Sequence, residues 1–357
     1  MEFAFLVHPR DLSDVFKKYP LLKFFPVSLT EFFLLKFWPP VFVAKITGLK
    51  LVGGGNSTNG CVLSIPLTAR QMMENRTVAS KKILDATIFA KNIGVKIIGL
   101  GALTSSLSKG GLDLIDKVDI NITTGHAYTA YNVTKNIFEL CRILDLDKTK
   151  ITVAIVGAAG SIGSTSARVL ARAGYQNLLL VDLERKRHFF EKLESELRNF
   201  NSGINIKFSH QIKDIINADV VITATNAPEA LVEAGDLKVG AIVVDDAQPS
   251  DISENVFERE DVLVVSAGVV HTPNIETHFN FGLADKFDNF CCLAELLILA
   301  SHKWDKHYII DRATLESVDE IAEWGEALGF HLAKFQNPRG LISTEKLSEI
   351  KRIIHQK

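Results

Sequence analysis

The chain has 357 residues, of which 47% are hydrophobic and 23% charged, and its formal net charge is −2. A chain of this length is too long to fold around one ordinary hydrophobic core, so we expect two or three domains. The small net charge gives no general attraction to nucleic acid, and we expect no nucleic-acid partner. The four cysteines lack metal-ligand spacing, so no metal site is expected. With no signal-peptide pattern at the N-terminus, the reducing cytoplasm is the simplest location.

The first fifty residues contain short apolar runs separated by prolines, and a strand is expected over 42–46. The Phe-rich stretch from Phe24 to Val43 is interrupted by prolines and charged residues. It therefore cannot span a bilayer as an unbroken apolar helix. Contact with a membrane surface through this Phe-rich region and burial in the core both stay open, and burial is the outcome we expect.

The next part of the chain alternates strands and helices. A turn is expected at 53–56, strands at 62–65 and 95–100, and helices at 68–93 and 128–144. The buried side of the helix at 68–93 is expected to contain Met72, Thr77, Ile83, Leu84, Ile88 and Ala90. Polar turns follow the strands that end near 100 and 123, and open α/β sheets bind ligands at such strand ends. Residues 1–130 are therefore predicted to form an N-terminal α/β substrate domain.

The segment from Ile151 to Glu184 has the pattern of a dinucleotide-binding βαβ unit. A β-branched strand stops at a glycine-rich turn, an Ala/Leu-rich helix follows, and a second strand ends in Asp182, 19 positions beyond Gly163. Glycines at such a turn allow a pyrophosphate to approach the backbone at the positive end of the helix. The residues expected to contact the cofactor here are Gly157, Gly160, Ser161, Ile162, Gly163, Asp182 and Arg185.

Further strands are expected at 204–208, 220–224, 242–246 and 262–267, with helices between them. The strand at 220–224 ends in Thr225 and Asn226, which we also assign to cofactor binding. Alternating strands and helices indicate a Rossmann-type, doubly wound parallel sheet, here spanning residues 131–275. Residues 276–357 are predicted to be mainly helical, with helices at 290–304, 315–329 and 345–354. The overall class is therefore α/β.

The first of these C-terminal helices contains two adjacent cysteines. Asp288 is expected to cap the helix, which places Cys291 and Cys292 near its first turn, where the helix dipole favours a thiolate. Cys292 lies on a different face from the apolar stripe, with Glu295 three positions further on. Cysteines in a buried helix are usually small hydrophobic residues, and spacing alone favours that interpretation.

From about Ile46 to Gly329 the chain resembles the long-chain acyl-[acyl-carrier-protein] reductases, best known from cyanobacteria, and their bacterial relatives. The resemblance is carried by the segments RTVASKKILDATIFAKNIGVKIIGLGALTS, ITTGHAYTAYN, VAIVGAAGSIGS, AGVV at 267–270 and FCCLAELLIL. In that family the nucleophile is the cysteine that precedes a Leu/Phe-Ala-Glu triplet, which corresponds to Cys292. The resemblance therefore makes Cys292 the expected nucleophile.

The resemblance implies reduction of a fatty acyl thioester, carried by acyl carrier protein or coenzyme A, to an aldehyde through a cysteine acyl-enzyme. NAD(P)H would supply the hydride. Well-studied members use NADPH, whereas Asp182 would accept bonds from a ribose 2′-hydroxyl and repel a 2′-phosphate, so we lean slightly to NADH. Arg185, Lys186 and Arg187 would be the residues to hold a phosphate. His271 is a candidate general acid, and His126 is no stronger.

Two other classes stay open. The same domain order occurs in shikimate-type and amino-acid dehydrogenases, which act on a small hydroxy or amino acid without a cysteine nucleophile. Those enzymes typically use a Lys/Asp pair, and Lys82 with Asp85 is the candidate here, although a solvated helix face is the simpler interpretation. The third class is a non-enzymatic sensor that binds NAD(P). Chain-length preference and oligomeric state are not predicted by the sequence.

Overall fold

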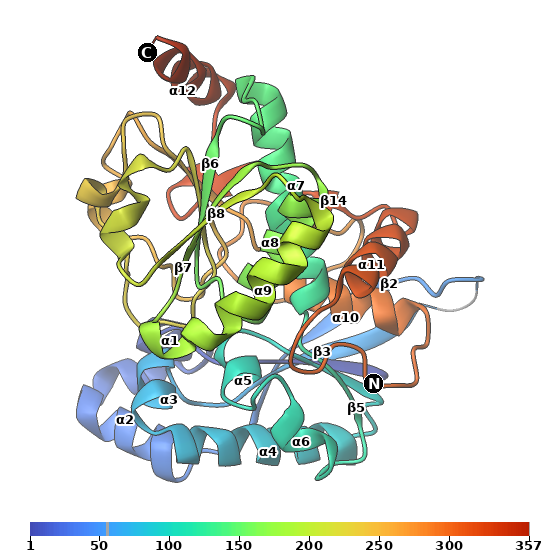
Figure 1. Ribbon diagram of the computed structural model, residues 1–357. Helices are drawn as coiled ribbons and strands as arrows, with labels where there is room; N and C mark the ends of the chain where they lie inside the picture. The colour runs from blue at the N-terminus through green and yellow to red at the C-terminus, as the bar shows by residue number, and fades with distance from the viewer. Residues whose placement is uncertain (55–56, 357) are drawn as a thin grey trace. The chain divides into compact units, whose positions relative to one another are not determined.

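The structure, a computed structural model, describes residues 1–54 and 57–356, and the chain divides into two compact units. Residues 55 and 56, part of the turn expected at 53–56, lie outside the described residues. The first unit comprises 1–125, 271–312 and 323–330, and the second comprises 126–270, 313–322 and 331–357 (Figure 1). The chain passes from the first unit to the second after residue 125 and returns to the first after residue 270, and residues 276–357 are divided between the two units.

The first unit is built on a five-stranded sheet in the order β2-β3-β1-β4-β5. Its strands are β1 (Phe3–Val7), β2 (Val41–Leu49), β3 (Thr58–Ser64), β4 (Ile97–Leu100) and β5 (Asn121–Thr123). Strand β2 runs antiparallel to β3, and the other four strands are parallel. We did not expect β1, whose five residues are all apolar, as is typical of a strand covered on both faces. The carboxyl ends of the parallel strands meet at one edge of this sheet.

The first 125 residues also contain several helices, of which α4 is the longest. They are α1 (Leu12–Lys18), η1 (Pro20–Phe24), α2 (Val27–Lys36), α3 (Ala69–Glu74), α4 (Arg76–Asn92), α5 (Leu103–Ser106) and α6 (Leu112–Ile115). The single helix expected over 68–93 is wrong, because the chain breaks at Asn75, where φ is −125° and ψ is 54°. Thr68 and Gln71 form a capping box that starts α3. Thr77 and Ile88 of α4 are exposed, contrary to expectation, whereas Ala79 and Ile83 are buried.

The burial expected for the Phe-rich segment is also wrong. Phe24 is 85% exposed and Phe37 is 67% exposed, and several neighbouring apolar side chains are exposed as well. Of the residues in α2, only Thr30 and Leu34 are buried. Proline interruptions excluded a membrane-spanning helix but did not determine which side chains the rest of the unit covers. None of the helices in the described part of the chain has the length and apolar character needed to cross a membrane.

The second unit contains a six-stranded sheet in the order β11-β10-β9-β6-β7-β8, and every adjacent pair is parallel. Its strands are β6 (Thr152–Val156), β7 (Asn177–Val181), β8 (Asn205–Ser209), β9 (Val220–Thr223), β10 (Ile242–Asp245) and β11 (Leu263–Ser266). This is the strand order of a dinucleotide-binding sheet, with its switch point between β6 and β9. The predicted α/β, doubly wound Rossmann-type fold is confirmed.

Helices α7 (His126–Leu144), α8 (Ser161–Arg172), α9 (Arg187–Phe200) and α12 (Thr344–His355) belong to the second unit, with 3₁₀ turns η2 (Glu184–Lys186), η3 (Ile212–Asn217), η4 (Ala234–Asp236) and η5 (Glu254–Val256). Helix α10 (Cys291–Ser301) and strand β13 (Asp288–Phe290) belong to the first unit, whereas α11 (Leu315–Ala327) contributes to both. The remaining short strands are β12 (Val269–His271), β14 (His331–Leu332), β15 (Gln336–Asn337) and β16 (Gly340–Leu341), and β15 pairs with β16.

Candidate active site

The glycine-rich turn after β6 is shaped by close backbone contacts. Gly157 has a φ of +87°, and a Cβ there would lie 2.5 Å from the carbonyl oxygen of Ala224, at the end of β9. A Cβ on Gly163 would lie 2.3 Å from the carbonyl oxygen of Gly157. A side chain at either glycine would therefore overlap a backbone carbonyl oxygen, at the point where the turn passes the ends of β6 and β9. The turn therefore has the close packing that a pyrophosphate-binding turn requires.

The same turn begins α8. Gly160 is the N-cap and no side chain caps the helix, so Ser161 and Ile162 lie in a first turn whose dipole favours an anion. The Ser161 Oγ accepts a hydrogen bond from the backbone N–H of Ala313 at 3.2 Å, within the same unit. The predicted residues Gly157, Gly160, Ser161, Ile162 and Gly163 thus lie together at one edge of the parallel sheet. The arrangement fits a dinucleotide phosphate.

Asp182, at the end of β7, is tied into this turn. Its Oδ2 accepts the backbone N–H of Ala159 at 2.9 Å, and its Oδ1 accepts the N–H of Leu183 at 2.8 Å. Lys186 lies 3.3 Å from Oδ1, and the Asp182 side chain is only 4% exposed. The carboxylate therefore fixes the glycine-rich turn in addition to any bond it makes to a ribose. Arg185 is exposed.

The turn after β9 carries a second buried carboxylate that sequence reasoning missed. Thr225 donates its hydroxyl to Asp251 Oδ1 at 2.6 Å and its backbone N–H to Oδ2 at 3.1 Å. Burial, and secondarily the nearby charge of Asp245, raise the pKa of Asp251 to about 7. Asp251 thus holds the turn containing Thr225 and Asn226. Asp251 lies five residues beyond the strand expected at 242–246, and no local pattern indicated its contact with Thr225.

In the first unit, helix α10 begins at Cys291, and its N-cap is Phe290 rather than Asp288. The expected capping role of Asp288 is wrong, because this residue lies in β13 and its carboxylate binds His271 instead. Cys291 is 1% exposed, whereas Cys292, the second residue of α10, is partly exposed. Burial raises the pKa of the Cys61 thiol to about 11 and also raises that of Cys141. Among these cysteines, Cys292 is the one that is both partly exposed to solvent and located in the first turn of a helix.

The backbone of Gly125, just after β5, lies against Cys292. Gly125 has a φ of +80°, and a Cβ there would lie 2.3 Å from the Cβ of Cys292. Glu295, one turn along α10, is fully buried and accepts the Gly125 N–H at 3.0 Å and the hydroxyl of Thr123. Glu295 thus fixes the loop that packs against the Cys292 side chain. The separation of about 170 residues between these partners explains why no local pattern indicated the contact.

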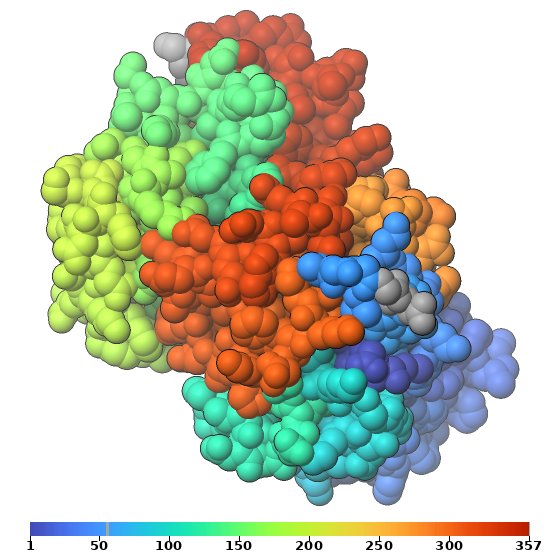
Figure 2. Space-filling model, turned by 90° about the vertical axis from the view of Figure 1, so that its right-hand side faces the viewer, coloured from blue at the N-terminus to red at the C-terminus, as the bar shows by residue number. Residues whose placement is uncertain are grey.

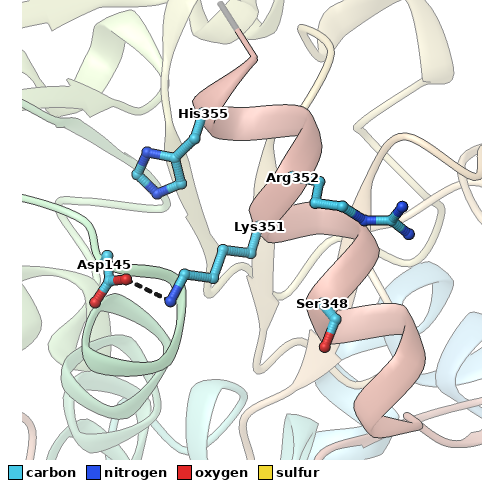
Figure 3. Close-up of a pocket in the computed structure, with 5 residues that line it drawn as sticks. All are labelled: Asp145, Ser348, Lys351, Arg352 and His355. Carbon is cyan, nitrogen blue, oxygen red and sulfur yellow. Dashed lines mark ion pairs between the residues drawn. The ribbon is translucent and has the colours of Figure 1, made fainter.

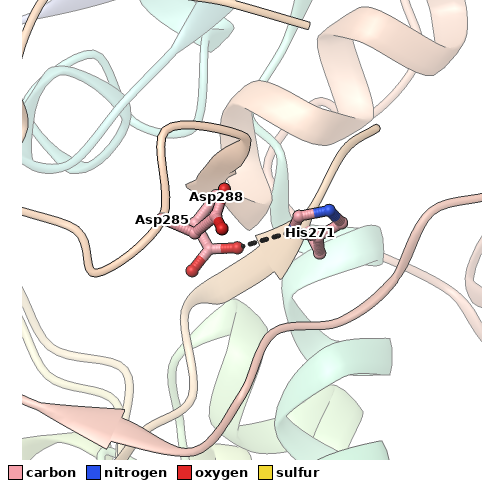
Figure 4. Close-up of side chains that lie close together, drawn as sticks. All are labelled: His271, Asp285 and Asp288. Carbon is pink, nitrogen blue, oxygen red and sulfur yellow. Dashed lines mark hydrogen bonds and ion pairs between the residues drawn. The ribbon is translucent and has the colours of Figure 1, made fainter. Parts of the chain in front are cut away.

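His271 and Asp288 form a pair on β12 and β13 (Figure 4). His271 Nδ1 lies 2.9 Å from Asp288 Oδ1, and Asp288 is 3% exposed while the His271 side chain is 23% exposed. Asp285 lies beside them, so that one potential ligand atom of each residue is within 4.8 Å of the others. A buried carboxylate that binds Nδ1 fixes the ring orientation and tautomer. Strand β13 leads directly into α10, which links this pair to the cysteine helix along the chain.

A depression of about 430 Å³ lies on the second unit, where α12 approaches the end of α7 (Figure 3). It is lined by Asp145, Ser348, Lys351, Arg352 and His355. Lys351 forms an ion pair with Asp145, and His355 Nε2 lies 2.8 Å from the Leu144 carbonyl oxygen. None of the predicted site residues lines it. Its contacts hold α12 against α7.

Comparisons with known proteins find a family match within the second unit and relatives that cover more of the chain. Residues 139–267 match the family described as Shikimate / quinate 5-dehydrogenase. The chain is 24% identical to aminotransferase PigE of Serratia over 99% of its own length, but it spans only 42% of that relative. It is 27% identical to the long-chain acyl-[acyl-carrier-protein] reductase of Synechococcus elongatus, over 83% of this chain and 89% of the relative.

A third relative is the glutamyl-tRNA reductase of Caldivirga maquilingensis, 26% identical over 54% of this chain and 44% of the relative. The shikimate-type match covers the dinucleotide-binding sheet and does not reach Lys82 or Asp85. Lys82 donates to the Trp38 carbonyl oxygen at 2.7 Å, which occupies its ammonium group in the first unit. The fold and these likenesses together support an NAD(P)-dependent oxidoreductase of the reductase type.

Proposed function

We propose that this protein reduces a fatty acyl thioester, carried by acyl carrier protein or coenzyme A, to an aldehyde through an acyl-enzyme on Cys292. The observation that carries the proposal is the setting of Cys292. Of the four cysteines, all within the described residues, Cys292 alone is not buried, and it occupies the first turn of α10. A helix N-terminus favours the thiolate form that attacks a thioester.

The first step of the proposed reaction forms the acyl-enzyme. The Cys292 thiolate attacks the acyl carbon, the bond to the carrier's sulfur breaks, and the carrier thiolate leaves and takes up a proton. A bound nicotinamide cofactor supplies hydride for the second step. In that step the acyl carbon gains a hydride, its bond to the Cys292 sulfur breaks, and the aldehyde leaves with the thiolate restored.

The neighbours of Cys292 have supporting roles in this proposal. Glu295, a predicted catalytic residue, acts as a positioning residue, because its carboxylate holds the Gly125 N–H and the Thr123 hydroxyl. His271, oriented by Asp288, is the candidate proton donor to the departing thiol. The role of His271 is tested by the pH profile of a His271 variant. Loss of a proton donor changes the pH dependence of turnover, whereas loss of a merely structural residue does not.

The names of two relatives support the substrate class. The acyl-[acyl-carrier-protein] reductase and the glutamyl-tRNA reductase are each named for reducing an acyl group attached to a larger carrier. Both reactions start from an activated acyl group rather than from an alcohol. For the cofactor we propose NADH, because Asp182 stands at the end of β7 where a ribose 2′-hydroxyl is bound in this fold. The exposed Arg185 and Arg187 are the residues that would favour NADPH.

The experiment that tests the proposal traps the acyl-enzyme. The protein is mixed with a long-chain acyl-coenzyme A in the absence of cofactor, and intact-mass spectrometry measures whether one acyl group is added. Peptide mapping should place it on Cys292, and NADH or NADPH should then release the aldehyde. No adduct and no aldehyde from any acyl thioester would contradict the proposal.

A second candidate is a dehydrogenase of a small hydroxy acid, favoured by the match of residues 139–267 to the shikimate-type family. That reaction would not need Cys292. Alkylation with iodoacetamide distinguishes the two, because labelling of Cys292 should abolish thioester reduction but leave a hydroxy-acid oxidation unchanged. Binding of NAD(P) without either activity would instead favour a sensor.

A further inference from the structure

The most exposed apolar surface of the first unit is formed by η1 and α2, at the edge of this unit (Figure 1). We define the N-terminal apolar patch as the exposed side chains of Leu21, Phe24, Phe25, Val27, Leu29, Phe32, Phe33 and Phe37, whose exposures range from 40% to 85%. Exposed apolar patches of this kind are unusual on soluble surfaces and mark interaction sites. Part of this N-terminal segment, in blue, reaches the surface in Figure 2.

The phenylalanines of α2 form one cluster. Leu29, Phe33 and Phe37 follow each other at four-residue spacing, which places them on the same side of a helix. The rings of Phe32, Phe33 and Phe37 lie 5.8–6.0 Å apart, centroid to centroid. This side of α2 and its C-cap Phe37 therefore present a cluster of exposed aromatic rings, with the exposed Lys36 next to them.

The opposite side of α2 is fixed to the rest of the unit by polar contacts. Glu31 pairs with Arg70 at 2.5 Å, and its backbone carbonyl accepts a bond from the Gln71 side chain at 2.9 Å. Lys82 binds the Trp38 carbonyl just beyond the helix at 2.7 Å. The helix is thus held with its aromatic side outward, so exposure of the rings follows from how α2 is attached.

The charge of the surrounding segment indicates what covers the patch. Residues 15–45 contain five lysines and one glutamate, a net charge of +4 in a chain whose total is −2. Lys23, Lys36 and Lys45 are exposed. Aromatic side chains beside lysines are typical of segments that lie in the interface of an anionic bilayer. A second copy of this patch would bring the same lysines together and is disfavoured by repulsion.

We infer that the N-terminal apolar patch is a membrane-contact surface that inserts its phenylalanines into the headgroup region of a bilayer containing anionic phospholipid. An acidic protein could also pair with the lysines, but it would need an apolar surface of its own to cover the phenylalanines, whereas an anionic bilayer offers both charged headgroups and an apolar interior. Contact with a bilayer needs neither a thioester substrate nor Cys292, so this inference is independent of the proposed function. It concerns a surface and not a membrane-spanning helix.

The experiment is flotation of the full chain with vesicles. With phosphatidylcholine–phosphatidylglycerol vesicles we expect wild-type protein in the lipid fraction, and less with phosphatidylcholine alone. The double variant Phe33→Ser/Phe37→Ser should lower the vesicle partition coefficient at least about tenfold, since two apolar side chains are lost from the interface. The control Phe200→Ser/Leu341→Ser removes side chains that are 44% and 56% exposed elsewhere and should leave the coefficient unchanged.

Charge reversal gives a second measurement. Lys23→Glu/Lys36→Glu should weaken binding to the anionic vesicles and make the remaining binding insensitive to salt. The inference is overturned if wild-type protein stays unbound with anionic vesicles, or if the patch variant and the control bind equally well. The inference is also overturned by a second pair of results. In that case the wild-type protein never binds vesicles, and the patch variant loses self-association or the binding of an acyl carrier protein. A circular-dichroism spectrum and an unfolding curve like those of the wild type show that each variant is folded.

Discussion

Gly125 and Cys292 lie so close together that a side chain at position 125 would overlap the cysteine: a Cβ there would be 2.3 Å from the Cys292 Cβ. Because the φ of Gly125 is +80°, a substitution also strains the backbone. We therefore expect Gly125→Ala to displace the thiol and to lower acyl transfer at least about tenfold, with a cost in stability of about 1–3 kcal/mol.

The matched control for this variant is Gly94→Ala. Gly94 has a φ of +82° but is exposed, and a Cβ there would meet nothing within 4 Å. It should lose about 1 kcal/mol of stability without any effect on turnover. If both variants lose turnover equally when stability is matched, the contact between Gly125 and Cys292 has no part in the reaction.

Replacement of the two neighbouring cysteines should give opposite results. Cys292→Ala should reduce thioester turnover at least about a thousandfold and leave dinucleotide binding intact, because the nucleophile is lost and the second unit is unchanged. Cys291→Ala should have little effect on turnover, since that side chain points about 100° away around the helix and is buried. Near-normal turnover of Cys292→Ala would rule out the acyl-enzyme, and labelling of Cys291 would move the nucleophile by one residue.

Asp251 should make the stability of the protein depend on pH. Its pKa is raised from 3.8 to about 7 by burial, so the folded chain holds a proton that the unfolded chain has released between these values. The free energy of unfolding should consequently fall as pH rises through this window, by up to about 1.4 kcal/mol per pH unit. Urea unfolding at about pH 5 and about pH 8 measures the slope.

Asp251→Asn should reduce that slope. The amide oxygen still accepts the Thr225 N–H, and the amide nitrogen donates to the Thr225 hydroxyl, so the turn is kept. Glu229→Gln, at an exposed position in the same region, should leave the slope unchanged. An unaltered slope in Asp251→Asn would show that another group, such as the buried Asp245, binds the proton.

Cofactor choice should depend on Asp182. A charge-assisted bond to a ribose hydroxyl is worth roughly 1.5–3 kcal/mol, so Asp182→Asn should change the ratio of NADH to NADPH affinity at least about tenfold towards NADPH. Asparagine can still accept the Ala159 N–H, which limits disturbance of the turn. Glu184→Gln, an exposed neighbour, is the control. Preference for NADPH in the wild type, unchanged by Asp182→Asn, would assign the choice to Arg185 and Arg187.

Docking of a carrier protein should involve α4. Arg70 of α3 and Arg76, Lys81 and Lys82 of α4 are basic. Arg70 and Lys82 make contacts within the unit, whereas Arg76 and Lys81 are exposed. We expect Arg76→Glu/Lys81→Glu to slow reduction of an acyl group on the acidic carrier protein, mainly through association and more strongly at low salt. Reduction of a small uncharged thioester should be unaffected.

The control for the carrier experiment reverses two exposed lysines of the second unit, Lys207 and Lys213. If the α4 variant slows both substrates equally, α4 matters for folding or chemistry rather than docking. If neither substrate is affected, Arg76 and Lys81 are ordinary surface residues.

The dinucleotide-binding sheet was predictable because its signals are local. The turn from Gly157 to Gly163 directly follows an apolar strand, and Asp182 lies one strand further on, so a short stretch of sequence specifies the unit. The start of α3 was also readable, since Thr68 and Gln71 have the spacing of a capping box, but the break at Asn75 had no such signal. The long apolar periodicity concealed it.

The contacts around Cys292 were less predictable because they are formed between distant parts of the chain. Glu295 and Gly125 are 170 residues apart, and no local pattern distinguishes a glutamate that holds a loop from one that acts in chemistry. The exposure of Phe24 and Phe37 is likewise a tertiary property. Composition showed that the segment was apolar, but only the attachment of α2 determined which side faces outward.

The division of the chain also sets the order in which the protein can be completed during synthesis. The first unit requires residues 271–312, so a ribosome must produce the whole sheet of the second unit before α10 and its thiol exist. The second unit in turn takes Ile350 of α12 into its core. A nascent chain therefore lacks α10 until the sheet of the second unit has been made, and no single cut would yield two fragments that each contain a complete unit.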